Sequence, residues 1–267
     1  MQMLQERSAD IGSRTVRYLE AGAGWPLVLL HAFPLSADMW RPQLDAPPEG
    51  WRLLAPDLSG FGPLAGPPAG TMAGMAGEVS AWLDALRIDR AVIGGLSMGG
   101  YVAFALYRLA PERFSGLLLA NTRASADTDE GRAGRERMLE ILREGGTPAV
   151  AEAMLPKLLG RTVAGRPELR AHVRRLIEAN AADAVAGALR AMRDRPDSTP
   201  MLADVHVPAL LVAGEEDVLV PRAEAEEMHA RLPRAQLVVL PRAGHLSNLE
   251  SPADFSEVLG NFLRANL

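Results

Sequence analysis

One serine of the chain lies between two glycines at a spacing that suits nucleophilic chemistry. In the stretch AVIGGLSMGGYVAF, Ser97 stands between Gly95 and Gly99, after a strand-like apolar run and before a helix-like one. A sharp turn between a strand and a helix strains the residue at its tip, and neighbours without side chains leave room for that turn. The following helix N-terminus favours developing negative charge beside the hydroxyl. The pattern predicts a nucleophilic Ser97; the alternative is a glycine-rich turn with an incidental serine.

A serine hydroxyl becomes a good nucleophile only when a base takes its proton. Of the five histidines, His245 lies in PRAGHLSNLESP, directly after the last strand-like run and before the last helical run. A histidine at that place can reach over the carboxyl edge of the sheet to Ser97, so we predict that His245 is the base. His172 and His229 lie in charged helical segments and His206 in a polar linker, and we expect all three to have no catalytic role.

The base needs an acid that fixes its tautomer and stabilises the imidazolium ion. The stretch LLVAGEEDVLVP places Glu215, Glu216 and Asp217 just past the end of a strand-like run. Their position in the sequence does not by itself decide which of the three carboxylates is the acid.

Three motifs together resemble the α/β-hydrolase superfamily, in the chain order serine, acid, histidine. They are G-x-S-x-G, then G-x-x-D-x-x-x-P from Gly214, then G-H-x-x-x-x-E-x-P from Gly244. The resemblance selects Asp217 as the acid, and Glu215 and Glu216 are then expected in a solvated loop. It covers residues 1–121 and 201–267.

A fourth motif concerns the anion site. The stretch LLHAFPLSADMW resembles the H-G-x-P loop of the same family. The resemblance implies that the backbone N–H groups of Phe33 and Met98 form the oxyanion hole and that His31 is a buried support for the loop. Ala32 departs from the family pattern, which has glycine there, and this bears on the position of the Phe33 N–H. Two carboxylates are expected to be structural, Asp57 in PDLSGFG and Glu250 in the histidine loop.

The elements that must position these residues alternate between strand-like and helix-like patterns. A hairpin is expected at the start, with RTVRYLE alternating its faces. Short apolar runs bounded by turn residues predict strands buried on both faces, and amphipathic patterns between them predict helices. The predicted fold is α/β, a mostly parallel twisted sheet with helices on both faces, and the resemblance implies eight strands. The strand-like runs lie at 26–31, 51–58, 91–95, 114–122, 207–217 and 235–241, and the helical patterns at 74–87, 98–110, 221–232 and 252–265.

Residues 122–200 break the alternation, because they contain no strand-like run and no Phe, Tyr or Trp. Their helical segments predict a cap inserted into a core formed by residues 1–121 and 201–267. We expect the cap to line the substrate pocket with aliphatic side chains, from residues such as Met138, Leu142, Met154, Leu158 and Leu159.

Composition excludes several classes of site. The chain of 267 residues has no cysteine, which rules out disulfides and thiolate chemistry, and no cluster with metal-ligand spacing, so no metal or cofactor is expected. A net charge of -5 without basic blocks gives no sign of a nucleic-acid or membrane surface. No secretory signal pattern and no run of about 18 apolar residues is present, so a cytoplasmic location is expected.

Three stretches of the sequence resemble one branch of this superfamily, that of the small bacterial carboxylesterases and 3-oxoadipate enol-lactonases. They are HAFPLSADMW, GLSMGGYVAF and ANTRASADT. This implies a hydrolase that cleaves esters or lactones of small to medium size through an acyl-serine intermediate, with a small molecule as its partner. Perhydrolases and carbon–carbon bond hydrolases with the same three residues remain open, as does a non-catalytic binding protein of this fold.

Overall fold

Eight strands form one sheet in the order β1-β2-β4-β3-β5-β6-β7-β8. The structure, a computed structural model, describes residues 3–64 and 66–267. β1 pairs with β2 and β2 with β4 in antiparallel orientation, and all the other pairs are parallel. This topology confirms the predicted α/β fold. The strands are β1 (Gln5–Ile11), β2 (Arg14–Gly22), β3 (Trp25–Leu30), β4 (Trp51–Pro56), β5 (Ala91–Leu96), β6 (Phe114–Ala120), β7 (Ala209–Gly214) and β8 (Ala235–Leu240).

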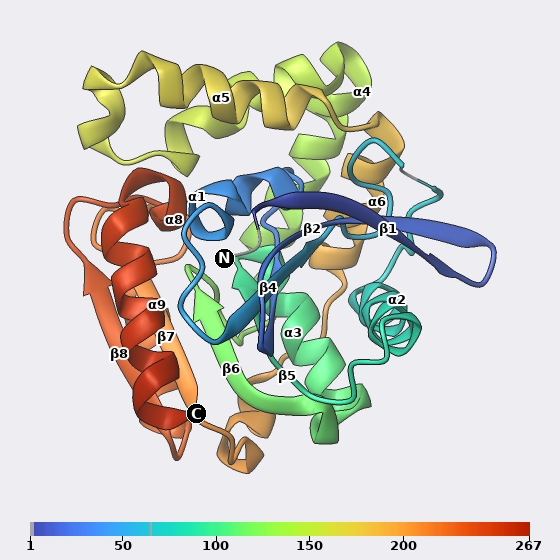
Figure 1. Cartoon of the computed structure of the whole chain (residues 1–267). Coiled ribbons are helices and arrows are strands. Elements are labelled where there is room, and N and C mark those ends of the chain that lie inside the picture. Colours follow the sequence, from blue (N-terminus) through green and yellow to red (C-terminus); the bar gives the residue numbers. More distant parts are fainter. Residues whose placement is uncertain (1–2, 65) are drawn as a thin grey trace.

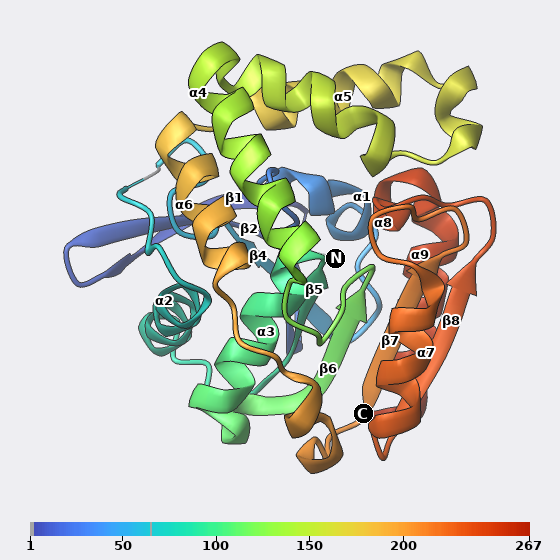
Figure 2. The ribbon, with the colours of Figure 1, turned by 180° about the vertical axis from the view of Figure 1, so that it is seen from behind.

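The central strands are the short apolar runs of the sequence. All residues of β5 and β7 are buried, as is all of β6 except Ser115. Strands buried on both faces require helices on both faces of the sheet. Figure 1 shows α9 in front of the sheet, and Figure 2, from behind, shows α3 and α7 across the opposite face.

The core helices begin and end within two residues of the predicted patterns. Short helical turns, Ala37–Trp40 and α1 (Arg41–Leu44), follow β3, and α8 (Ser247–Glu250) follows β8. No helix within residues 3–64 and 66–267 is long and apolar enough to cross a membrane. The other core helices are α2 (Met72–Ala85), α3 (Met98–Leu109), α7 (Arg222–Arg231) and α9 (Pro252–Asn266).

The expected alternation of faces along RTVRYLE is wrong. The residues of β2 from Val16 onward are buried on both faces, while β1 is largely exposed. β2 lies between β1 and β4 in the sheet, so its charged residues Arg17 and Glu20 are buried too. They are paired: Arg17 contacts three carboxylates, and Glu20 pairs with Arg7 at 2.9 Å and with Arg52 at 2.6 Å.

The segment between β6 and β7 is helical, as the sequence predicts. It forms α4 (Asp129–Leu158), a short turn Arg161–Gly165, α5 (Pro167–Glu178), α6 (Ala182–Arg193) and a final turn Thr199–Asp204. α4 is kinked at Gly146, where φ is 66°. We call α4, Arg161–Gly165, α5 and α6 the inserted helices. Figures 1 and 2 show them beyond the carboxyl ends of the central strands.

The division into a core and a cap stays a prediction. Met1, Gln2 and Ala65 of the predicted core lie outside the described residues.

Candidate active site

Ser97 occupies the turn between β5 and α3. Its φ of 56° and ψ of −112° are strained for a residue with a side chain, so the surroundings must hold it in place. Its N–H donates to the carbonyl of Ala120 at 2.9 Å, and its carbonyl accepts from the hydroxyl of Thr122 at 2.8 Å. Both partners belong to β6 or the residues just after it. The neighbouring strand therefore fixes the strained turn.

The glycines around Ser97 are required by close backbone packing. A Cβ on Gly95 would lie 2.5 Å from the carbonyl oxygen of Leu30, and one on Gly99 would collide with that same carbonyl. A Cβ on Gly100 would lie 2.5 Å from the Thr122 hydroxyl. The start of α3 therefore packs directly against the end of β3. This contact explains the glycine pattern of the sequence.

His245 and Asp217 are hydrogen-bonded to each other. His245 lies in the loop between β8 and α8, and its Nδ1 is 2.8 Å from Asp217 Oδ2. The other carboxylate oxygen, Oδ1, accepts from the N–H groups of Leu219 at 2.8 Å and Val220 at 3.0 Å. An ionised carboxylate only accepts, so Nδ1 carries the proton and Nε2 has a free lone pair. That nitrogen is available as a base.

The charge of Asp217 is stabilised by its neighbours. Burial alone raises the pKa of this carboxyl, but the positive charge that His245 carries when protonated and the hydrogen bonds from His245, Asn121 and Val220 outweigh it. The pKa of Asp217 is therefore below its ordinary value. The carboxylate stays ionised beside the imidazole at neutral pH.

Asn121 also contacts Asp217 and the histidine loop, although no motif of the sequence marks it. Its Nδ2 donates to Asp217 Oδ2 at 2.9 Å and to the carbonyl of Gly244 at 3.2 Å, and its Oδ1 accepts from Ser247 Oγ at 2.5 Å. One side chain thus connects the acid to the histidine loop. Its φ of 45° is a backbone conformation that asparagine tolerates better than most residues. An asparagine directly at the carboxyl end of a strand was the available signal.

The loop after β3 brings Phe33 to the same cavity as Ser97 and His245. The N–H of Leu58 donates to His31 Nε2 at 3.0 Å, so Nδ1 carries the proton and donates to the carbonyl of Ala32 at 3.0 Å. Complete burial lowers the pKa of His31 to about 4, so the ring is neutral. His31 thereby joins the loop to the residues after β4. It is not among the residues that line the cavity.

Met98 is the first residue of α3, where backbone N–H groups have no partner within the helix, so its N–H is available to an acceptor beside Ser97.

No hydrogen bond joins the Ser97 hydroxyl to the His245 ring among the described residues. Such contacts often tighten only once a substrate is bound.

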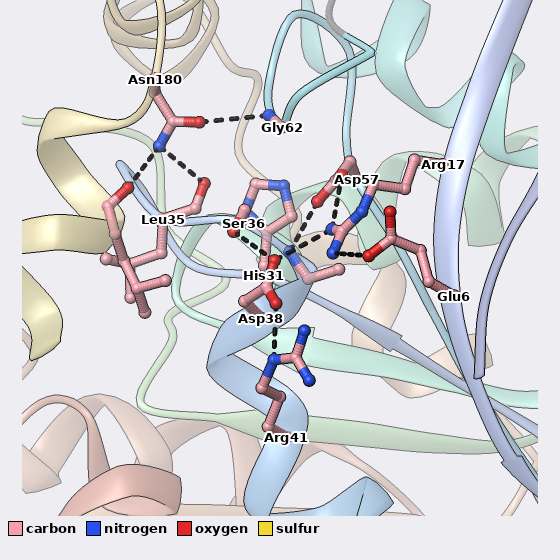
Figure 3. A network of polar contacts seen from close by, with 12 residues as sticks. Glu6, Arg17, His31, Leu35, Ser36, Asp38, Arg41, Asp57, Gly62 and Asn180 are labelled. Atoms are coloured by element: carbon pink, nitrogen blue, oxygen red, sulfur yellow. Dashed lines mark hydrogen bonds and ion pairs between the residues drawn. The ribbon is translucent and has the colours of Figure 1, made fainter. Parts of the chain in front are cut away.

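An ion-pair network around the buried Arg17 and Asp57 holds the far end of the loop (Figure 3). Asp57 Oδ1 accepts from the N–H of Ala37 at 2.8 Å, and its Oδ2 lies 3.0 Å from Arg17 Nη1. The same guanidinium contacts Asp38 at 2.9 Å and Glu6 at 2.8 Å. Asp57 thus has the structural contacts that its motif predicts. No motif of the sequence marks Arg17 as a partner of this carboxylate.

Glu250 connects the histidine loop to the inserted helices. Its Oε1 accepts from the N–H of Leu246 at 3.2 Å, and its Oε2 accepts from the N–H of Gly160 at 2.7 Å. Burial raises the pKa of Glu250. These backbone hydrogen bonds act in the opposite direction but do not outweigh the burial. Glu216 makes a similar contact, since its Oε2 accepts from the N–H of Arg161 at 2.6 Å.

The expectation of a solvated loop is right for Glu215 and wrong for Glu216. The side chain of Glu215 is exposed, whereas that of Glu216 is only 13% exposed because the inserted helices pack against it.

A cavity of about 240 Å³ opens above Ser97 and His245. Met138 and Met154 line it, as expected, but Leu142, Leu158 and Leu159 do not. The expectation of an aliphatic lining is wrong in one further respect, because four charged residues also contribute. The residues between β6 and β7 that line the cavity are Arg123, Asp127, Gly131, Gly134, Arg135, Met138, Met154, Lys157, Leu189 and Met192.

The charges in this lining are unequal, with three cations and one anion. Asp127 is shared by Arg135 at 3.0 Å and by the buried Arg195 at 2.7 Å. Arg123 lies 3.4 Å from Glu224, while Lys157 has no ion pair among the described residues. The cavity wall is therefore positive.

A profile of the α/β-hydrolase fold family matches residues 26–252, which include every element that carries Ser97, Asp217 and His245. The chain belongs to the α/β-hydrolase fold family.

Several α/β-hydrolase relatives resemble it over nearly their whole length. It is 28% identical to 3-oxoadipate enol-lactonase 1 of Acinetobacter baylyi over 239 residues, which cover 90% of this chain and 88% of that protein. A thermophilic esterase from Thermogutta terrifontis, solved with malate bound, superposes with a TM-score of 0.90 at 34% identity, covering 98% of both chains. The enol-lactonase from Burkholderia xenovorans gives a TM-score of 0.89 at 27% identity, covering 97% of this chain and all of that one.

The α/β-hydrolase fold brings Ser97, His245 and Phe33 to one cavity and leaves the other four histidines outside its lining. His206 and His229 are exposed, and His172 on α5 is half-buried. Burial and the charge of Arg175 lower the pKa of His172.

Proposed function

We propose that this α/β hydrolase cleaves carboxylic ester or lactone bonds through an acyl-serine intermediate. The observation that supports this best is the 2.8 Å hydrogen bond between His245 Nδ1 and Asp217 Oδ2, with His245 lining the cavity of Ser97. It leaves Nε2 as the acceptor on the side of the ring that a substrate would meet.

In the proposed reaction, Ser97 Oγ attacks the carbonyl carbon of the substrate while its proton passes to His245 Nε2. The carbonyl oxygen becomes an oxyanion, which accepts hydrogen bonds from the N–H groups of Phe33 and Met98. The protonated His245 then gives its proton to the departing alkoxide, leaving an acyl-serine. Water deprotonated by His245 releases the acid, and Asp217 stabilises the imidazolium ion in both halves of the reaction.

The inserted helices act as the cap in this proposal. Their residues contribute Met138, Met154 and Lys157 to the cavity, and the small volume suits small to medium acyl groups. The positive wall favours substrates whose acyl group ends in a carboxylate. The names of the relatives agree in chemistry, since 3-oxoadipate and malate are carboxylates.

Purified protein is expected to turn over p-nitrophenyl butyrate many times per molecule. The measurement is the amount of p-nitrophenol released over time, compared with the molar amount of protein. Absence of turnover with every ester and lactone of a panel would contradict this proposal and leave carbon–carbon bond hydrolysis or non-catalytic binding as the alternatives.

Dialysis against a chelator is expected to leave this turnover unchanged. Ser97, His245 and the two N–H groups already supply the nucleophile, base and anion site that ester hydrolysis needs. Loss of activity that a divalent ion restores would contradict the mechanism.

Replacing Lys157 with methionine is expected to lower kcat/KM selectively for an anionic substrate. The matched substrates are the p-nitrophenyl monoester of glutaric acid and p-nitrophenyl pentanoate, which differ by a terminal carboxylate. Lys157 is exposed, so its loss should cost roughly two- to fivefold for the monoester and little for the neutral ester. Arg143→Met is the control, because Arg143 lies on the same helix but outside this cavity. Equal losses for both substrates would show that Lys157 does not recognise charge.

A further inference from the structure

The side chain of Asn180 joins the inserted helices to the loop that carries Phe33. Asn180 lies in the turn between α5 and α6 and is buried. Its Nδ2 donates to the carbonyl of Pro34 at 2.8 Å and lies 3.4 Å from that of Leu35. Its Oδ1 accepts from the N–H of Gly62 at 3.2 Å (Figure 3). One amide thus contacts two loops of the core.

The orientation of this amide is fixed by partners on all sides. Nδ2 also donates to the carbonyl of Leu176 in α5 at 2.8 Å, so its two N–H groups face only carbonyl oxygens. Oδ1 faces a donor, the N–H of Gly62. A carboxylate of the same shape could keep the Gly62 contact but would face the carbonyls without a proton to share.

The carbonyl that Asn180 binds lies one residue beyond the proposed oxyanion donor. The loop turns sharply here, because the N–H of Leu35 donates to the carbonyl of Ala32 at 2.9 Å. The core holds the base of this turn through the contact between His31 and Ala32. Asn180 holds its tip at Pro34. The Phe33 N–H lies between these two attachments.

We propose that Asn180 is a positioning residue for the oxyanion hole, through which the inserted helices keep the Phe33 N–H in place. The proposal rests on the proposed function. An oxyanion donor acts on the charge that develops in the transition state, so a small displacement of it lowers kcat and changes KM little. A contact that only held the inserted helices in place would instead affect stability or substrate binding.

The test is a comparison of Asn180→Asp and Asn180→Ala with the wild type, using p-nitrophenyl butyrate and titration of Ser97 to count active molecules. Both variants are expected to lose roughly 10- to 100-fold in kcat, with KM within about threefold of wild type. Affinity for a trifluoromethyl ketone should fall by a similar factor. This inhibitor accepts Ser97 Oγ at its carbonyl carbon and so places an anionic oxygen in the hole.

Arg108→Met is the control for general loosening of the segment between β6 and β7. Arg108 lies on α3 and donates to Ser198 Oγ at 2.7 Å, near the other end of that segment and away from the cavity. This variant is expected to keep its kcat even where its melting temperature falls.

The inference is overturned if the folded Asn180 variants keep their kcat, or if their loss lies in KM only. Because the two variants change the site differently, either one that folds decides the matter. Turnover by the wild type is measured separately, so failure of the proposed function is distinguishable from failure of this inference.

Discussion

Ser97→Ala is expected to lower kcat for p-nitrophenyl butyrate by roughly 10⁵- to 10⁶-fold, the scale on which a serine protease loses activity with its nucleophile. The protein should stay folded, because the contacts that hold this turn come from the backbone of Ser97 and not from its hydroxyl. Circular dichroism and thermal unfolding check the fold, and steady-state kinetics the activity.

Ser125→Ala is the matched control for this loss. Ser125 follows the neighbouring strand, β6, but its hydroxyl donates to Glu224 at 3.1 Å and does not line the cavity. Its removal should leave kcat close to wild type. If Ser97→Ala kept more than about 1% of the activity, far above the floor expected without a nucleophile, another group would have to attack the ester.

Asp217→Asn is expected to lower kcat by at least about 10³-fold near neutral pH, while the protein stays folded. The structure gives the reason. The N–H groups of Leu219 and Val220 require an acceptor where Oδ1 lies, so the amide oxygen would take that place. The amide nitrogen would then face His245 Nδ1, which must become an acceptor. The ring proton moves to Nε2, and the base is lost.

Glu215→Gln and Glu216→Gln are the controls, since both residues lie beside Asp217 and neither contacts His245. Each is expected to stay within about tenfold of wild type, as their charges are distant from the reaction and screened by salt. The Glu216 variant keeps an oxygen that can accept from the N–H of Arg161. If a glutamine variant fell to the level of Ser97→Ala while Asp217→Asn stayed active, the acid would be a glutamate.

The sequence determined the features that depend on neighbouring residues along the chain. The strand-like runs predicted the parallel strands, because burial on both faces requires continuous apolar residues. Gly95 and Gly99 predicted the tight turn at Ser97, because close packing there excludes side chains. Turn residues after β7 and β8 placed Asp217 and His245 at the same sheet edge. The alternation of strand-like and helix-like patterns predicted the α/β fold. The resemblance of the motifs to a known superfamily was needed to select Asp217 as the acid beside Ser97 and His245.

The tertiary structure decided what depends on residues far apart in the sequence. Asn121 contacts Asp217 across 96 positions, and Asn180 contacts Pro34 across 146, distances over which no local pattern carries information. Burial of Arg17 in β2 depends on which strands lie beside it, and the local pattern suggested alternation instead. The positive cavity wall likewise depends on which face of α4 turns inward. The amphipathic pattern of a helix shows that it has a buried face, whereas the partner that covers this face is chosen by the packing of the whole chain.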